Sequence, residues 1–227
     1  MNVLKKALLG LAVTTMGTMA LIQPAAAMPI TVTGMQYDSP TTATIHLDGK
    51  KPGDKNDLDI SVSAGAFAAT VDGKSLMAWC VDIFQVTTFN QLITDYYIGS
   101  AATFGQSKVD ALTRLATEAL GLVKNSKTSG AFQLAAWEIV NETSSSYDLS
   151  GGSFRANDVS NGSKSLAQTW LDNLPATSTY SLTLYISPDK QDLAVFKVPE
   201  PATTALLGLG LLGFAASRRK LAKSKKA

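Results

Sequence analysis

Residues 28 to about 89 alternate apolar and polar side chains with the two-residue period of half-buried β-strands. The alternation is clearest at residues 30–33, 42–47 and 58–62. Asp72-Gly73 lies between two apolar-rich runs, which is a typical signal for a tight β-hairpin. Residues 76–84 then form an apolar run that predicts a buried strand.

From Ser107 to about Glu142 the apolar residues recur at helical spacing. We expect one helix from Ser107 to Gly121 or Asn125, a second from about Ser129 to Glu142, and a third at residues 163–174. Residues 180–186 alternate again and return the chain to a sheet. Strands, then helices, then a strand favour an α+β fold over alternating β-α-β units. We therefore expect a β-rich framework, sandwich- or barrel-like, with a helical insert.

The N-terminus has the pattern of a secretory signal peptide. Lys5 and Lys6 precede an apolar stretch, and Ala25 and Ala27 supply the small side chains that signal peptidase requires. We expect cleavage after Ala27, which removes residues 1–27 and exports the rest.

The C-terminus has three parts in a set order: the motif Val198, Pro199, Glu200, Pro201, an apolar run at residues 202–217, and a basic segment at residues 218–227. This order resembles the PEP-CTERM sorting tail, in which a Pro-Glu-Pro motif precedes one short membrane helix and a basic stop. The resemblance implies processing by an exosortase, a membrane peptidase/transpeptidase of bacteria that produce exopolysaccharide. Because the cations favour the cytoplasmic side, the protein would be anchored transiently in the membrane and then reach the cell surface or extracellular matrix.

The charge of the chain is divided between its ends and its middle. The whole chain has a net charge of +2. The two N-terminal lysines contribute +2 and the residues after Pro199 contribute +5, so residues 28–197 carry a net charge of −5. Clustered cations are needed to bind phosphates. The acidic middle domain, residues 28–197, therefore excludes nucleic acid as an expected partner.

The chain contains a single cysteine, Cys80, so an exported domain built from it has no internal disulfide. Cys80 stands in Trp79-Cys80-Val81-Asp82, and the second expected helix carries Phe132-Gln133 and Trp137. This ordered pair resembles the thioester domains of bacterial surface proteins. The resemblance implies a bond between the Cys80 sulfur and the Gln133 side-chain carbonyl, through which the domain attaches covalently to an amine on a target.

The chemistry of a thioester explains these residue types. Thiolate attack on a carboxamide expels ammonia and leaves an activated acyl group, which water would hydrolyse if admitted. Trp79, Phe132 and Trp137 are the expected shield against water. Asp82, Glu138 and Tyr96 are candidates for assisting proton transfer.

Two other functions compete with covalent attachment. Cysteine is often a buried, inert core residue, in which case the protein is a non-reactive structural component of the exopolysaccharide or biofilm matrix. An enzyme acting on a diffusible substrate is a more distant alternative, and we expect no enzymatic turnover and no cofactor.

The remaining polar motifs have simpler explanations. His46, the only histidine, would serve a Cys–His peptidase only with an orienting third group, and we expect a solvent-facing strand residue. Asp54, Asn56, Asp57 and Asp59 are rich in oxygen ligands, but they lack the EF-hand spacing, so a solvated turn is expected rather than a calcium site. One cysteine and one histidine exclude a Cys/His zinc site.

Overall fold

The computed structural model describes residues 27–48, 58–144, 146–199 and 214. The expected signal peptide, membrane helix and basic stop lie outside these residues, except for Ala27 and Phe214. Within the described residues, no helix is long and apolar enough to cross a membrane.

The described residues form strands and helices with the following bounds. The strands are β1 (Met28–Met35), β2 (Thr41–Leu47), β3 (Leu58–Ala64), β4 (Phe67–Val71), β5 (Lys74–Cys80), β6 (Leu92–Gly99), β7 (Phe154–Asn157), β8 (Ser181–Ile186) and β9 (Leu193–Lys197). The helices are α1 (Ala101–Phe104), α2 (Gln106–Ala119), α3 (Ser126–Asn141) and α4 (Ser163–Asp172), with short 3-10 turns η1 (Leu120–Leu122) and η2 (Ser160–Gly162).

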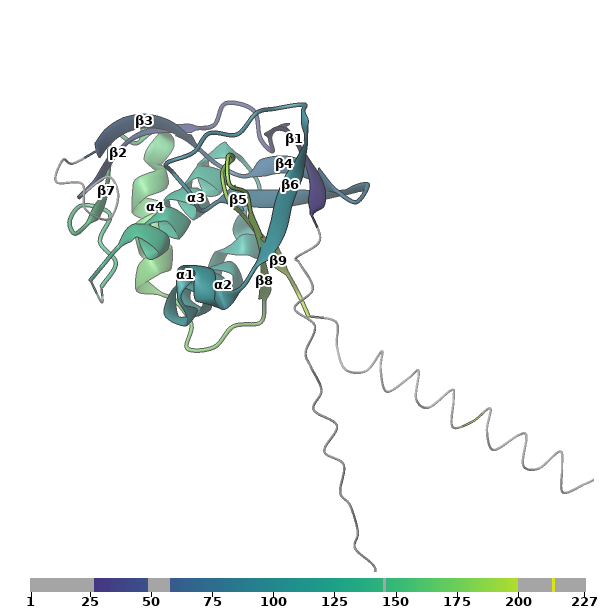
Figure 1. Cartoon of the computed structure of the whole chain (residues 1–227). Helices are drawn as coiled ribbons and strands as arrows, with labels where there is room; N and C mark the ends of the chain where they lie inside the picture. The colour runs from purple at the N-terminus through teal and green to yellow at the C-terminus, as the bar shows by residue number, and fades with distance from the viewer. Residues whose placement is uncertain (1–26, 49–57, 145, 200–213, 215–227) are drawn as a thin grey trace, which may run out of the picture.

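The strands of the described part form two separate systems. Six close into a barrel in the order β1-β4-β5-β9-β8-β6, and three form a small sheet in the order β3-β2-β7. The small sheet stands at one end of the molecule and the barrel at the other, with α3 between them (Figure 1). This arrangement confirms the β-rich α+β framework with helices inserted into it.

The hairpin joining β4 to β5 forms where the sequence predicts it. Asp72 and Gly73 both have positive φ, at 49° and 73°, and Val71 pairs with Lys74. Positive φ at both central positions is the requirement of a type I′ turn, which Asp-Gly meets at low cost.

The expected strand at residues 76–84 is too long. β5 ends at Cys80, and although the Val81 N–H still donates to the Asp192 carbonyl at 2.9 Å, the chain then turns. The Asp82 carboxylate accepts a hydrogen bond from the Phe84 N–H at 2.8 Å, a local turn that competes with strand pairing.

Helix α3 is the core element that both strand systems share. Every residue from Ser129 to Val140 is buried, and the helix contacts β2, β3, β5, β7, α2 and α4. It begins at Ser126, earlier than the expected Ser129, because Asn125 caps it: the Asn125 side chain accepts from the Thr128 N–H, and Thr128 bonds back to the Asn125 N–H. Asn125 therefore starts this helix instead of ending the preceding one.

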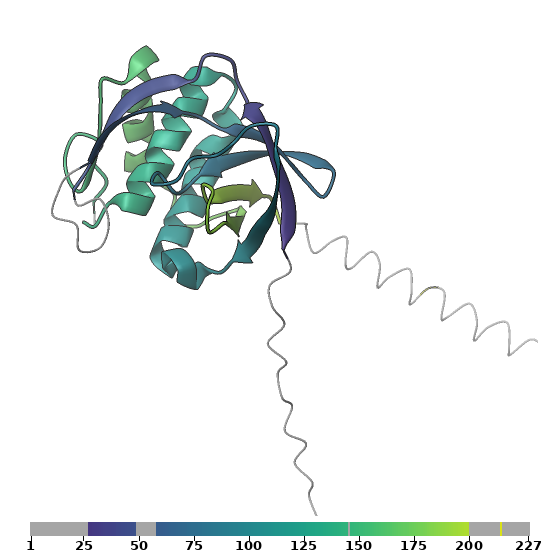
Figure 2. The same ribbon diagram turned by 45° about the horizontal axis from the view of Figure 1, so that its top comes forward.

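Strand β9 connects the barrel to the sorting tail. Its first residue, Leu193, pairs with Cys80, and its last, Lys197, pairs with Ser181. The start of β1 and the end of β9 lie at the same end of the barrel (Figures 1 and 2). Both chain ends therefore leave the barrel together, and Cys80 lies at the opposite end of β9.

Candidate functional site

Cys80 and Gln133, 53 residues apart in the chain, are joined by two hydrogen bonds in the core. The Cys80 N–H donates to Gln133 Oε1 at 3.1 Å, and Gln133 Nε2 donates to the Cys80 carbonyl at 2.7 Å. Cys80 is 1% exposed and Gln133 is fully buried. The carboxamide is thus fixed against the backbone of the cysteine.

Close packing against the small sheet sets the position of α3 and therefore of Gln133. Gly130 faces Thr41 of β2 so closely that a Cβ on Gly130 would lie 1.9 Å from the Thr41 hydroxyl oxygen. One residue earlier, Ser129 Oγ accepts a hydrogen bond from the Ala66 N–H at 2.8 Å. These contacts hold the first turns of the helix against β2 and against the connection between β3 and β4.

Cys80, Gln133 and Trp137 line one cavity of about 210 Å³. The rest of its lining in the described part of the chain is mostly apolar and has no charged side chain: Met35, Val62, Ser63, Gly65, Phe67, Ile83, Val86, Thr87, Phe89 and Gln191. Phe89 packs edge-on against Phe67, with ring centroids 6.0 Å apart, and so fixes the loop that follows Cys80. Sequence reasoning missed this loop, because only the fold brings residues 83–89 over the cysteine.

Burial controls the acidity of the thiol. It raises the pKa of Cys80 to about 12, opposed by the Trp137 side chain and the Asp82 backbone and reinforced by the carboxylates of Asp82 and Asp192. The thiol itself donates to the Asp82 carbonyl at 3.0 Å. Cys80 is therefore protonated at neutral pH.

The three expected shielding residues occupy two places. Trp137 lines the cavity. Trp79 and Phe132 pack on each other with centroids 4.2 Å apart, and Phe132 also meets Phe196 edge-on at 5.6 Å. Trp79 and Phe132 are not among the lining residues, so they support the strand and the helix that carry the cavity.

The three candidates for assisting proton transfer do not all lie near the thiol. Asp82 and Tyr96 lie near the thiol: Asp82 through its carbonyl, and Tyr96 through an electrostatic interaction with Cys80. Burial raises the pKa of Tyr96, whose hydroxyl donates to the Gln191 carbonyl at 2.8 Å. Glu138 instead accepts from the Asp148 N–H at 2.7 Å, and its electrostatic neighbours are Glu142 and Asp148.

Asp192 is an additional acidic group near Cys80 that no sequence motif indicated. Burial raises its pKa to about 6, opposed by the Ser187 N–H and reinforced by Asp82. It precedes Leu193, the pairing partner of Cys80 in β9. A carboxyl group with this pKa titrates close to neutral pH.

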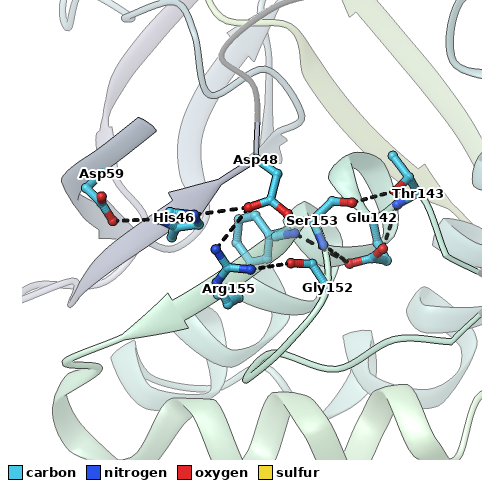
Figure 3. Close-up of polar contacts among 9 residues, drawn as sticks. His46, Asp48, Asp59, Glu142, Thr143, Gly152, Ser153 and Arg155 are labelled. Atoms are coloured by element: carbon cyan, nitrogen blue, oxygen red, sulfur yellow. Dashed lines mark hydrogen bonds and ion pairs between the residues drawn. The ribbon is translucent and has the colours of Figure 1, made fainter. Parts of the chain in front are cut away.

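His46 belongs to a different cluster, on the small sheet (Figure 3). Its ring nitrogens contact Asp59 at 2.9 Å and Asp48 at 3.1 Å, and Arg155 bonds Asp48 at 2.9 Å. His46 does not line the Cys80 cavity, so the two residues do not form a Cys–His pair.

The same figure shows a buried carboxylate, Glu142, held by backbone donors (Figure 3). It accepts from the N–H groups of Thr143, Ser144, Ser153 and Phe154. Burial alone would raise the pKa of Glu142, but these donors outweigh it and lower the pKa. Glu142 thus closes the loop between α3 and β7.

In the described part of the chain, no group of three or more His, Cys, Asp or Glu side chains is arranged to hold a metal ion. Asp54, Asn56 and Asp57 of the oxygen-rich turn lie outside the described residues, whereas Asp59 is in β3.

Comparison with known proteins identifies the tail. The model of the PEP-CTERM protein-sorting motif matches residues 197–220. No curated protein and no solved structure matches the chain. The match confirms the PEP-CTERM sorting tail that the motif at Val198–Pro201 predicted. The chain is therefore an exported protein that an exosortase sorts to the cell surface.

Proposed function

We propose that Cys80 and Gln133 form an internal thioester through which this exported protein attaches covalently to amine-bearing targets. The observation that carries the proposal is the pair of hydrogen bonds between the Gln133 carboxamide and the Cys80 backbone. A bond between two side chains requires their reacting atoms to be held close together, and these hydrogen bonds restrain the carboxamide beside the cysteine.

The same hydrogen bonds suit the chemistry of bond formation. The Cys80 sulfur attacks the Gln133 side-chain carbonyl carbon, the C–N bond breaks, and the thiol proton leaves with the nitrogen as ammonia. The Cys80 N–H, 3.1 Å from Oε1, is aimed at the oxygen where negative charge develops. An amine then attacks the same carbon, forms an amide, and returns a proton to the departing sulfur.

The cavity fits an acyl group that must persist in water. Its lining is mostly apolar, which limits access of water to the bond. Among the described residues, no charged side chain lines it and could pair with an ammonium group, so the attacking amine enters in its neutral form. Aminolysis should therefore become faster as pH rises toward the pKa of the amine.

The attachment of the tail is compatible with this role. The sorting motif begins at Lys197, the last residue of β9, whereas Cys80 pairs with the first residue of that strand. At about 3.3 Å per residue, the tail leaves the domain about 13 Å along the strand from Cys80. Anchoring at the tail therefore leaves the cavity region separate from the anchor.

Mass spectrometry of the purified exported chain tests the proposal. A thioester lowers the mass by one ammonia, and methylamine converts it to an adduct on Gln133 with a free Cys80. Cys80→Ser and Gln133→Ala should both lose the mass deficit and the adduct. A wild-type protein at full mass, with Cys80 open to alkylation after unfolding, would falsify the thioester.

One observation favours a second candidate, a non-reactive structural protein of the extracellular matrix. The thiol is 1% exposed, and burial raises its pKa to about 12, as in an inert core cysteine. The mass measurement separates the two candidates, because an inert cysteine leaves the chain at full mass and unreactive toward methylamine.

A further inference from the structure

The indole of Trp137 is one of the buried polar groups of the cavity that lack a hydrogen bond of normal geometry in the described part of the chain. The indole N–H of Trp137 is buried and forms no hydrogen bond of normal geometry within the described structure, although the residue is only 3% exposed. Buried indole N–H groups normally find an acceptor. Trp137 lines the cavity together with Cys80 and Gln133, and it follows Gln133 by one helical turn on α3.

The sulfur of Cys80 offers the matching acceptor. Its own proton is directed to the Asp82 carbonyl at 3.0 Å, which leaves the sulfur lone pairs available. When the thiol loses that proton, the nearby Asp82 and Asp192 carboxylates oppose the new negative charge. The lining that the described residues form is mostly apolar and has no cation to compensate for this charge.

We propose that the Trp137 indole N–H donates a hydrogen bond to the Cys80 sulfur and stabilises its thiolate during thioester formation and acyl transfer. The inference rests on the proposed function and adds a catalytic residue to it. In the first reaction the donor stabilises the attacking sulfur before ammonia leaves. In the second it stabilises the sulfur that departs from the acyl carbon, until the proton from the attacking amine reaches it. The donor lowers the barrier in both directions and is not consumed.

Shielding alone makes the opposite prediction for one substitution. Trp137→Phe removes the donor and also leaves a smaller ring, which opens the cavity to water and amine. If Trp137 only shields the bond, the variant reacts faster with methylamine. If it stabilises the thiolate, the variant reacts about ten-fold more slowly, the effect expected for one hydrogen bond to a charged group.

The experiment compares Trp137→Phe with Trp170→Phe in the full chain. Trp170 is 4% exposed, so it is equally buried, but it lies on α4 and does not line the cavity. We expect slower methylamine incorporation only in Trp137→Phe. An unchanged or faster rate would overturn the inference while leaving the thioester standing. If Trp137→Phe does not fold, the isosteric benzothienyl analogue of tryptophan removes the N–H and keeps the shape.

A spectroscopic readout tests the contact even if the thioester does not form. The chain has three tryptophans, so an amide- and indole-resolved NMR spectrum contains three indole N–H signals. Trp137→Phe assigns one of them. We expect Cys80→Ala to move that signal upfield and to leave the Trp170 signal in place. A Trp137 signal that stays in place would rule out the hydrogen bond, whereas a full-mass wild type would reject only the proposed function.

Discussion

The side-chain amide of Gln133 bonds to Cys80 as the backbone of a neighbouring strand would, accepting from its N–H at 3.1 Å and donating to its carbonyl at 2.7 Å. Gln133 is fully buried, so water cannot replace either bond. In the protein before thioester formation, we expect Gln133→Leu to lower the free energy of unfolding by about 3 kcal/mol, since two buried backbone groups lose their partner.

Gln168 provides a matched control. Its Oε1 accepts from the Leu149 N–H at 3.0 Å and its Nε2 donates to the Tyr147 carbonyl at 3.0 Å, but the residue is only half-buried. Gln168→Leu should cost about 1 kcal/mol, because water can satisfy the released groups. Urea denaturation measures both variants. Equal losses would contradict the importance of burial at Gln133.

The elements that the sequence predicted correctly are those with local causes. The Asp72-Gly73 turn and the alternation in β2 depend on neighbouring residues alone. In β6 the two buried residues, Ile93 and Tyr96, are three apart, so no alternation is visible. In β9 the first three residues are all buried and do not alternate either. Neither strand was predicted, because their burial comes from closure of the barrel.

The candidate site also has features that depend on local sequence and features that depend on the fold. The identities of Cys80, Gln133 and Trp137 suggested a site, but nothing in the sequence could place the loop at residues 83–89 or Asp192 beside the thiol. Those contacts arise when β9 pairs with β5 and α3 packs against β5. Glu138, which lies close to Gln133 in the chain, instead interacts with Asp148.

Gly130 allows α3 to approach β2 closely. Ala is normally the better helix residue by about 1 kcal/mol, yet a Cβ here would lie 1.9 Å from Oγ1 and 2.3 Å from Cβ of Thr41. We expect Gly130→Ala to destabilise the protein by about 2 kcal/mol or more, since the helix must shift. Gly121→Ala is the control, because a Cβ there has no atom within 4 Å, and thermal unfolding should show it unchanged or slightly stabilised.

His46 should stabilise the small sheet in a pH-dependent way. The hydrogen bond to Asp59 raises the pKa of His46 above 6.5, helped by Asp48 and opposed by partial burial and Arg155. A raised pKa means stability that is fully present below about pH 6.5 and lost as pH rises through the folded value. His46→Gln should therefore be less stable than the wild type at about pH 5, and the gap should narrow by about pH 9. A difference in stability between the two proteins that stays constant with pH would show that His46 acts through packing alone.

Ionisation of Glu138 should lower the stability of the fold, whereas ionisation of an ordinary paired carboxylate raises it. Burial raises its pKa from 4.5 to about 8, opposed by the Asp148 N–H and reinforced by Glu142 and Asp148. The folded chain therefore holds a proton that the unfolded chain releases, and stability falls as pH rises from about 4.5 to about 8. Glu138→Gln keeps the acceptor for Asp148 and cannot ionise. We expect it to match the wild type near pH 4.5 and to exceed it by on the order of 2 kcal/mol near pH 8.

Glu142, one helical turn further on, is the control, because its ionisation should raise the stability of the fold instead of lowering it. Its backbone donors lower the pKa, so its contribution is present above about pH 4.5 and lost as pH falls through the folded value. Glu142→Gln places an amide group against these N–H donors and should be destabilising at neutral pH, with the difference shrinking in acid. Denaturant unfolding measures how the stability of both variants depends on pH. It should cover roughly pH 3 to 9, the range in which both groups titrate. If the two variants changed stability in the same direction at neutral pH, the protonated state assigned to Glu138 would be wrong.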